Sequence, residues 1–259
     1  MSSPVRRGAR HGFDLVELDS PANRNALSIA LLTELLSAVR DSAAGSARGL
    51  VLTHSGPAFC AGVDLKERAR LDRSDARHSE LLAALLRELW HYPKPVVAML
   101  DGVVRGGGLG LVACADIVLA TRQSSFAYSE ARVGVAPALV MAVTLPTGDG
   151  RRLLPHLLDA RTFDADQARE IGLVSTVVSD QEAVDDTLEA LRSGAPGALV
   201  TIKRLARQWS ATDVDELLEE ATALSAELFG AAEATEGMAA FAERRRPRWA
   251  ADQEGEIPS

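Results

Sequence analysis

Three consecutive glycines, Gly106, Gly107 and Gly108, follow an apolar segment and open a pattern typical of a helix. The first peptide N–H groups of a helix have no acceptor within the helix, and glycine lets a ligand approach them closely. Together with the positive end of the helix dipole, these donors favour a negatively charged group. The triplet is therefore a candidate anion site, although a tight turn that requires glycine would also account for it.

A second segment, upstream, has the same arrangement. An apolar stretch is followed by the small residues Cys60, Ala61 and Gly62, which lead to Asp64. Small side chains expose the backbone, so the peptide N–H of Val63 can point at a ligand. Two N–H groups from separate loops can hold one oxygen and stabilise it as it becomes an anion, by roughly 3 to 4 kcal/mol for each donor. The two segments together therefore suggest an oxyanion hole.

The glycine triplet does not fit two common nucleotide-binding motifs. A dinucleotide fingerprint has glycines at its first, third and sixth positions and an acidic residue about 20 positions later. Counted from Gly106, the sixth position is Leu111, and the nearest acidic residue, Asp116, comes too early. The lysine of a phosphate-binding loop is also missing from this segment. Both motifs are excluded.

Short apolar segments alternate with amphipathic stretches over the first two thirds of the chain, which predicts an α/β fold. The predicted strands are residues 13–18, 50–53, 96–100, 117–120 and 174–178. The predicted helices are residues 27–40, 77–90 and 108–115, and then, in an almost wholly helical C-terminal part, residues 182–192, 199–209, 213–229 and 234–245. We therefore expect an α/β core in residues 1–180 and a helical region in residues 181–259, within one structural unit.

The composition excludes several classes of partner. The chain has 259 residues and a formal net charge of −8, which argues against nucleic acid. No apolar run approaches the roughly 20 residues of a membrane span, so we expect no membrane partner. The two cysteines, Cys60 and Cys114, lie in small apolar contexts and suggest a reducing, cytoplasmic compartment. The N-terminal segment MSSPVRRGAR is expected to be a short flexible lead.

Four motifs, in order and spacing, carry a resemblance to a known family: AFCAGVDLKE from Ala58, DGVVRGGGLGLVACADIVLA from Asp101, SFAYSEARVGVAPA from Ser125 and ATEGMAAFAERRRPRW from Ala234. They resemble the enoyl-CoA hydratase/isomerase (crotonase) superfamily, and the match begins at NRNAL from Asn23. The resemblance implies a crotonase-like spiral of ββα units followed by a C-terminal helical trimerisation region. It also implies a homotrimer or a dimer of trimers.

The resemblance further implies an acyl-CoA thioester as substrate, with no additional cofactor and no metal. In the family the thioester oxygen lies between two peptide N–H groups, which match those of Val63 and Gly107. The substrate-binding and CoA-binding residues implied by the same matching are Ala22, Arg24, Ala61, Asp64, Leu65, Lys66, Arg105 and Ser129.

Local cations would meet the anionic end of such a ligand despite the negative net charge. Arg24 and Lys66 are the candidates for the phosphate groups, and Arg105 is a candidate for the wall of the acyl pocket. The resemblance also implies that the basic segment Arg244–Arg246 with Arg248 lies near the CoA of the same or a neighbouring subunit.

Family hydratases use two glutamates around one water molecule, and this sequence has one of them. Glu130, in the motif SEARVG, matches the second glutamate, whereas the first would stand at Gly110. Loss of a positioned acid or base typically costs on the order of 100- to 10,000-fold in rate. An isomerase needs only one carboxylate, which removes a proton from C2 of a 3-enoyl thioester and returns it at C4. We therefore expect Glu130 to be the catalytic group of a double-bond isomerisation.

Two alternatives stay open. A hydratase or another crotonase-type lyase could recruit a different acid, for which Asp64, Glu67, Tyr128 and Asp149 are the candidates. The chain could instead bind acyl-CoA without catalysis. The histidines show neither metal-ligand spacing nor an accompanying nucleophile motif, so no role is assigned to them: His11, His54, His78, His91 and His156.

Overall fold

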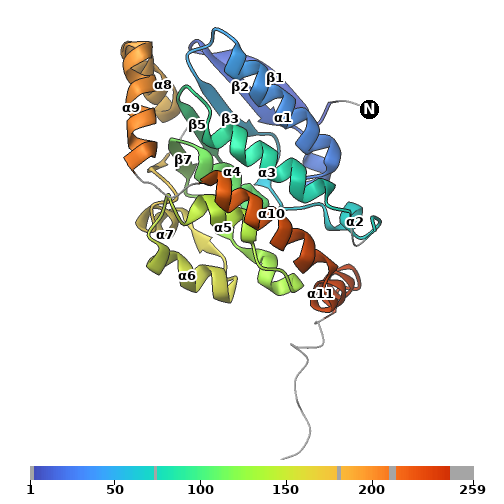
Figure 1. Ribbon diagram of the computed structural model, residues 1–259. Coiled ribbons are helices and arrows are strands. Elements are labelled where there is room, and N and C mark those ends of the chain that lie inside the picture. The colour runs from blue at the N-terminus through green and yellow to red at the C-terminus, as the bar shows by residue number, and fades with distance from the viewer. Residues whose placement is uncertain (1–2, 73–74, 180–181, 210–213, 246–259) are drawn as a thin grey trace, which may run out of the picture.

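Two β-sheets organise the protein, whose computed structural model describes residues 3–72, 75–179, 182–209 and 214–245 (Figure 1). The larger sheet has the order β1 (Val5–Arg10), β2 (Phe13–Leu18), β3 (Leu50–His54), β5 (Val96–Leu100), β7 (Ile117–Thr121) and β10 (Thr176–Val178). The smaller sheet has the order β4 (Ala58–Cys60), β6 (Val103–Arg105), β8 (Ser125–Ala127) and β9 (Phe163–Asp164). Neighbouring strands are parallel except in the pairs β1–β2 and β8–β9.

The helices follow the strands in a repeated order. They are α1 (Ile29–Ala44), α2 (Leu65–Arg68), α3 (Arg77–Trp90), α4 (Gly107–Cys114), α5 (Ala138–Thr144), α6 (Gly150–Asp159), α7 (Ala165–Glu170), α8 (Glu182–Ser193), α9 (Pro196–Trp209), α10 (Val214–Gly230) and α11 (Ala232–Ala242), with the short 3-10 helices η1 (Pro21–Asn23) and η2 (Ser129–Val133). Three consecutive strand pairs, β3–β4, β5–β6 and β7–β8, each contribute their first strand to the larger sheet and their second strand to the smaller sheet. A helix follows each pair. This repeat confirms the predicted α/β class and the spiral of ββα units.

Both faces of the larger sheet are buried along β3, β5 and β7, which explains why these strands read as continuous apolar runs. Along β3, Leu50 and Leu52 pack into the main core under α1, α3 and α4, whereas Val51 points to the opposite face. There it meets Val184 and Leu188 of α8. A helix from the C-terminal part of the chain therefore completes the core of the N-terminal sheet.

The N-terminal lead is a strand, so the expectation of a flexible segment was wrong. β1 pairs antiparallel with β2 over its whole length and forms the edge of the larger sheet. Arg6 and Arg7 are exposed and Arg10 is half-buried, and they make ion pairs, with Arg6 Nε 2.6 Å from Asp19 Oδ2 and Arg10 Nε 2.7 Å from Asp185 Oδ1. Charged residues protect an exposed edge from further strand pairing, but they also hide the apolar alternation that marks a strand.

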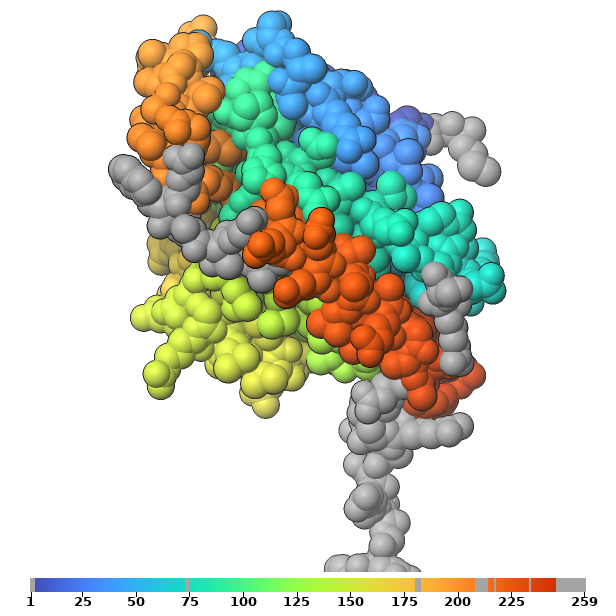
Figure 2. Space-filling model, viewed as in Figure 1, coloured from blue at the N-terminus to red at the C-terminus, as the bar shows by residue number. Residues whose placement is uncertain are grey.

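The two last helices lie across the α/β core. Figure 2 shows α10 and α11 as a ridge between the surface of α2 and α3 and that of α5 and α6. Arg87 Nε of α3 lies 2.8 Å from Asp215 Oδ1 of α10 and anchors the start of this ridge. At the other end, Gly237 of α11 packs directly on the backbone of Val133 in η2. Trimer formation through this region stays a prediction.

The contact at Gly237 gives a test of this docking. A Cβ on residue 237 would overlap the backbone carbonyl of Val133, whereas a Cβ on Gly197 in α9 would meet no described atom within 4 Å. Alanine normally favours a helix over glycine by up to about 1 kcal/mol. We expect Gly197→Ala to leave the thermal midpoint unchanged or raise it, and Gly237→Ala to lower the free energy of unfolding by roughly 1 to 3 kcal/mol in urea titrations. A Gly237→Ala protein as stable as Gly197→Ala would contradict this packing.

Candidate active site

The glycine triplet forms the turn from β6 into α4, and close contacts fix it there. Gly106 has φ of 51°, and a Cβ on it would lie 3.1 Å from Oε1 of Glu130. A Cβ on Gly108 would lie 2.6 Å from the Cβ of Cys60. Side chains at these two positions would therefore displace the catalytic candidate Glu130 or the strand β4.

The second loop, after β4, is held by the segment before α1. The N–H of Leu27 donates to the carbonyl of Gly62 at 2.7 Å, and the N–H of Asp64 donates to the carbonyl of Leu27 at 3.3 Å. Val63 lies between these two bonds and uses its own N–H in neither. The pairing thus fixes the backbone of Val63 and leaves its donor available.

One sulfur atom joins the two loops. The N–H of Gly62 donates to Sγ of Cys60 at 3.4 Å, and the backbone of Gly108 also hydrogen bonds to this thiol. Burial raises the pKa of Cys60 to about 12, so the thiol stays neutral. The intervening donors, the N–H groups of Val63 and Gly107, have no acceptor within the described residues. Two peptide donors from separate loops are therefore available, as predicted.

Glu130 lies in η2, beside the turn at Gly106. Its Oε2 is buried and has no hydrogen-bond partner among the described residues. Burial raises the pKa of Glu130 to about 7, and a hydrogen bond from its own backbone N–H opposes this shift only in part. Such a carboxyl group exchanges a proton near neutral pH, which suits a general base or acid.

Val63, Gly107 and Glu130 line one cavity of about 40 Å³. Its other walls come from His78, Ser79 and Leu82 of α3, from residues 135–140 at the start of α5, and from Ser225 and Phe229 of α10. The structure therefore brings together the three residues predicted for the chemistry. It adds four polar or aromatic residues that the sequence did not single out: His78, Ser79, Ser225 and Phe229. The spacing of His78 and Leu82 on one helix face was the available signal.

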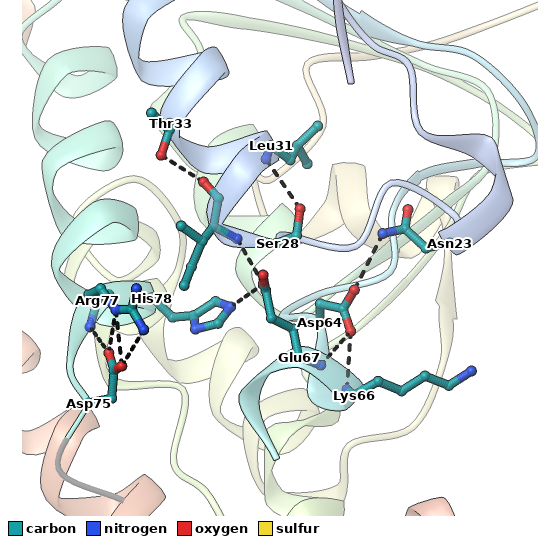
Figure 3. A network of polar contacts seen from close by, with 11 residues as sticks. Asn23, Ser28, Leu31, Thr33, Asp64, Lys66, Glu67, Asp75, Arg77 and His78 are labelled. Carbon is teal, nitrogen blue, oxygen red and sulfur yellow. Dashed lines mark hydrogen bonds and ion pairs between the residues drawn. The ribbon is translucent and has the colours of Figure 1, made fainter. Parts of the chain in front are cut away.

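The predicted CoA-binding segments lie side by side, although their role toward CoA stays a prediction. The N–H of Ala61 donates to the carbonyl of Arg24 at 3.1 Å, and Nδ2 of Asn23 lies 3.4 Å from Oδ2 of Asp64 (Figure 3). Arg24, Lys66 and Ala22 are exposed, whereas Leu65 and Ser129 are half-buried. The exposed cations Arg24 and Lys66 thus lie on two segments that these hydrogen bonds join, and their binding of phosphate groups stays a prediction.

Arg105 is not among the residues that line this cavity, and its place in the wall of the acyl pocket stays a prediction. Its guanidinium donates to the carbonyl of Ser125 at 2.6 Å and to Oγ of the same residue at 3.1 Å, between the neighbouring strands β6 and β8 of the smaller sheet. Burial lowers the pKa of Arg105, and the nearby cations Arg132 and Arg24 add to this effect.

The predicted C-terminal basic patch lies partly outside the described residues. Arg246 and Arg248 belong to the part of the chain that is not described. Arg245 makes ion pairs with Glu236 at 2.6 Å and with Glu243 at 2.5 Å, and Arg244 is exposed.

The candidates for a substitute acid are mostly engaged elsewhere. Asp64 and Asp149 cap the N-termini of α2 and α6, where their side chains accept backbone N–H groups. Tyr128 stacks on Phe163, with ring centroids 6.1 Å apart, and burial raises the pKa of its hydroxyl. Glu67 binds His78, with Oε2 2.9 Å from Nε2. None of the four lines the cavity.

Gly110, where a second glutamate would stand, is enclosed by apolar side chains. A Cβ on this residue would lie 3.1 Å from Cδ2 of Leu86 and 3.7 Å from Cγ2 of Val140. The space that a glutamate would need is therefore filled by the core, and the replacement is accommodated by the packing around it.

A larger cavity, of about 560 Å³, lies under α9 and contains none of the predicted site residues. Its charged lining residues pair with one another: Nζ of Lys203 lies 2.6 Å and Nη2 of Arg207 lies 3.0 Å from Asp116. Because the charged groups of this larger cavity already form ion pairs, it is a weaker candidate for catalysis than the cavity at Glu130. Among the described residues, no helix has the length and apolarity of a membrane span, and no cluster of His, Cys, Asp or Glu is arranged to hold a metal.

The protein is similar to several known proteins. Residues 9–252 match the family model described as enoyl-CoA hydratase/isomerase. The mitochondrial enoyl-CoA hydratase of Pongo abelii is 30% identical, with 93% of this chain and 84% of that protein covered. The carnitinyl-CoA dehydratase of Proteus mirabilis is 32% identical, with 79% and 82% covered.

Solved structures agree with this match. An enoyl-CoA hydratase from Mycobacterium avium, known from its crystal structure, is 37% identical in sequence and superposes with a TM-score of 0.86. The superposition covers 96% of this chain and 100% of that chain. With the family model spanning nearly the whole sequence and the fold shared in full, the chain belongs to the enoyl-CoA hydratase/isomerase family and is an enzyme of that type.

Proposed function

We propose that this enzyme moves a double bond on the acyl group of an enoyl-CoA thioester, from the 3 position to the conjugated 2 position. The observation that carries the proposal is Glu130, a single buried carboxyl group beside two unpaired peptide donors, with apolar packing at Gly110 in place of a second carboxylate. The family relationship supports a CoA thioester as substrate.

The reaction begins at the thioester carbonyl. Its oxygen accepts hydrogen bonds from the N–H groups of Val63 and Gly107, and negative charge develops on it as the C2 proton leaves. Donors held rigidly by the fold stabilise that charge more in the transition state than in the ground state. The cross-bonding of both loops through Cys60 supplies this rigidity.

Glu130 carries the proton. In its ionised form it removes the proton from C2, the electrons of that C–H bond move into the enolate, and the protonated carboxyl group then returns the proton at C4. The carboxylate is regenerated when the 2-enoyl thioester forms, so no other acid or base is required. A pKa near 7 allows both transfers, because neither form of the group is strongly favoured at neutral pH.

Replacing the carboxylate tests this role. We expect Glu130→Gln to reduce the turnover of a 3-enoyl-CoA by at least about 100-fold, because the amide cannot accept a proton. Formation of the conjugated thioester is followed by its ultraviolet absorbance. Glu170→Gln, an exposed position on α7, is the matched control and should keep full activity. Turnover of Glu130→Gln within threefold of the wild type would exclude the proposal.

The pH profile tests the ionisation state. Because burial raises the pKa of Glu130 to about 7, the carboxylate fraction increases as the pH rises through that value. We expect kcat/KM for isomerisation to increase about tenfold per pH unit below pH 7 and to level off above it. Two titratable groups beside Glu130, Cys60 and Tyr128, stay neutral over this range because burial raises both of their pKa values. A profile that is flat or falls between about pH 6 and 8 would contradict the base role.

The donor at Val63 can be removed without removing the pairing around it. Val63→Pro lacks the N–H, yet the bonds between Leu27 and the neighbours of Val63 involve only the carbonyl of Gly62 and the N–H of Asp64. We expect Val63→Pro to lower kcat by about 100- to 1000-fold and Val63→Ala to lower it by less than tenfold. Thermal midpoints check that both variants fold. Equal activities for the two folded variants would show that the Val63 N–H does not act on the substrate.

A further inference from the structure

His78, in the first turn of α3, is a buried histidine with one nitrogen bonded and one not. The residue is 4% exposed. Its Nε2 lies 2.9 Å from Oε2 of Glu67 (Figure 3). Its Nδ1 is buried and has no hydrogen-bond partner among the described residues. A buried polar atom without a partner costs free energy, and such an atom in a native site commonly awaits water or a ligand.

Glu67 fixes which nitrogen of His78 carries the proton. Oε2 of Glu67 also accepts the backbone N–H of Ile29 at 2.8 Å, so this oxygen acts as an acceptor. The neutral imidazole therefore donates through Nε2 and presents the lone pair of Nδ1 as an acceptor. A carboxylate that holds an imidazole in one tautomer is the arrangement by which histidine serves as a general base.

His78 belongs to the same site as Glu130. Both residues line the 40 Å³ cavity, and each brings one buried polar atom without a partner. This volume is sufficient for one water molecule, which needs two to four polar partners. The hydroxyls of Ser79 and Ser225, 3.1 Å apart on α3 and α10, add polar groups to the same wall.

The position of His78 along α3 relates it to the glycine loop. Leu82, four residues later on the same helix face, would contact a Cβ on Gly107 at 3.3 Å, and Leu86, four residues further, occupies the space beside Gly110. On the face of α3 that approaches α4, Leu86 thus occupies the space that a glutamate at position 110 would need. The same face carries His78, an acid–base side chain, about two helical turns earlier.

We propose that His78, held by Glu67, is a second proton-transfer residue of this site and activates a water molecule for addition to a 2-enoyl thioester. The inference rests on the proposed binding of the thioester at Val63 and Gly107. Nδ1 takes a proton from the water, the water oxygen bonds to C3, and the electrons of the C2–C3 double bond move into the enolate. Protonated Glu130 then gives its proton to C2. The imidazolium and the carboxylate return to their starting forms by proton exchange with solvent.

The test compares two reactions of the full-length enzyme. Hydration of a 2-enoyl-CoA is followed by the loss of conjugated absorbance and by the gain of water in mass spectrometry, and isomerisation of a 3-enoyl-CoA is measured alongside it. We expect His78→Gln to lower the ratio of hydration to isomerisation kcat by at least 30-fold. Glu67→Gln, which weakens the positioning of His78, should lower this ratio by a smaller factor. His91→Gln is the matched control, because His91 also binds a carboxylate, Asp215, at the end of α3 but does not line the cavity.

The outcomes separate this inference from the proposed function. If the wild-type enzyme catalyses hydration, His78→Gln loses that reaction and no isomerisation is seen, the inference about His78 holds and the proposed isomerase function is excluded. A wild-type enzyme without hydration, or equal loss of both reactions in His78→Gln, overturns the inference.

If His78→Gln does not fold, the inference is tested by the pH profiles of hydration and isomerisation in the wild-type enzyme. Hydration uses protonated Glu130 and should fall above about pH 7, whereas isomerisation uses the carboxylate and should rise up to about pH 7 and then level off. Around the two groups, the titratable and charged neighbours are Cys60 and Tyr128 beside Glu130, and Glu67 with Arg77 beside His78. Parallel profiles for the two reactions would overturn the inference.

Discussion

The burial of the Glu130 carboxyl group, with no ionic partner among the described residues, is the constraint on which the site depends. Water is removed from around the carboxylate, so the group holds its proton to near neutral pH instead of releasing it in mild acid. Enclosing it favours a glycine at position 106, where φ is 51° and a Cβ would lie only 3.1 Å from Oε1. It also requires η2 to be held in place, which the close packing of α11 at Gly237 achieves. Segments separated by more than 100 residues therefore determine the chemistry of one side chain.

The two peptide donors depend on a different contact, the crossing of two loops over one sulfur atom. Cys60 accepts hydrogen bonds from the backbones of Gly62 and Gly108, so the donors of Val63 and Gly107 remain free beside the cavity. A buried cysteine that reads as a small apolar residue in the sequence thus connects the halves of the predicted oxyanion hole. Close packing also determines the residue at position 110, because Leu86 and Val140 occupy the volume that a second carboxylate would need.

The sequence predicted those parts of the fold whose pattern is local. The central strands of the larger sheet, β3, β5 and β7, are buried on both faces and are marked by apolar runs, and α3 begins and ends where its apolar face predicts. The strands of the smaller sheet are only two or three residues long, which is too short to show the alternation of apolar and polar residues. The edge strand β1 is charged, so its sequence hides this alternation. The motifs located Glu130, Val63 and Gly107 in one cavity. They did not find His78, because its significance lies in a contact with Glu67 of α2. They also did not show that the side chain of Arg105 binds the carbonyl of Ser125 on the neighbouring strand.

The fate of the C2 hydrogen is the most direct measure of whether the buried carboxylate carries the proton. The enzyme would convert a 3-enoyl-CoA in D2O in a single turnover, and the product would be examined by NMR and mass spectrometry. The carboxyl group is buried, so we expect the proton to reach C4 within one turnover before it exchanges with solvent, and the product to carry most of the original C2 hydrogen at C4. A full equivalent of deuterium at C4 from the first turnover would contradict this expectation, because the proton would then come from a group in contact with solvent.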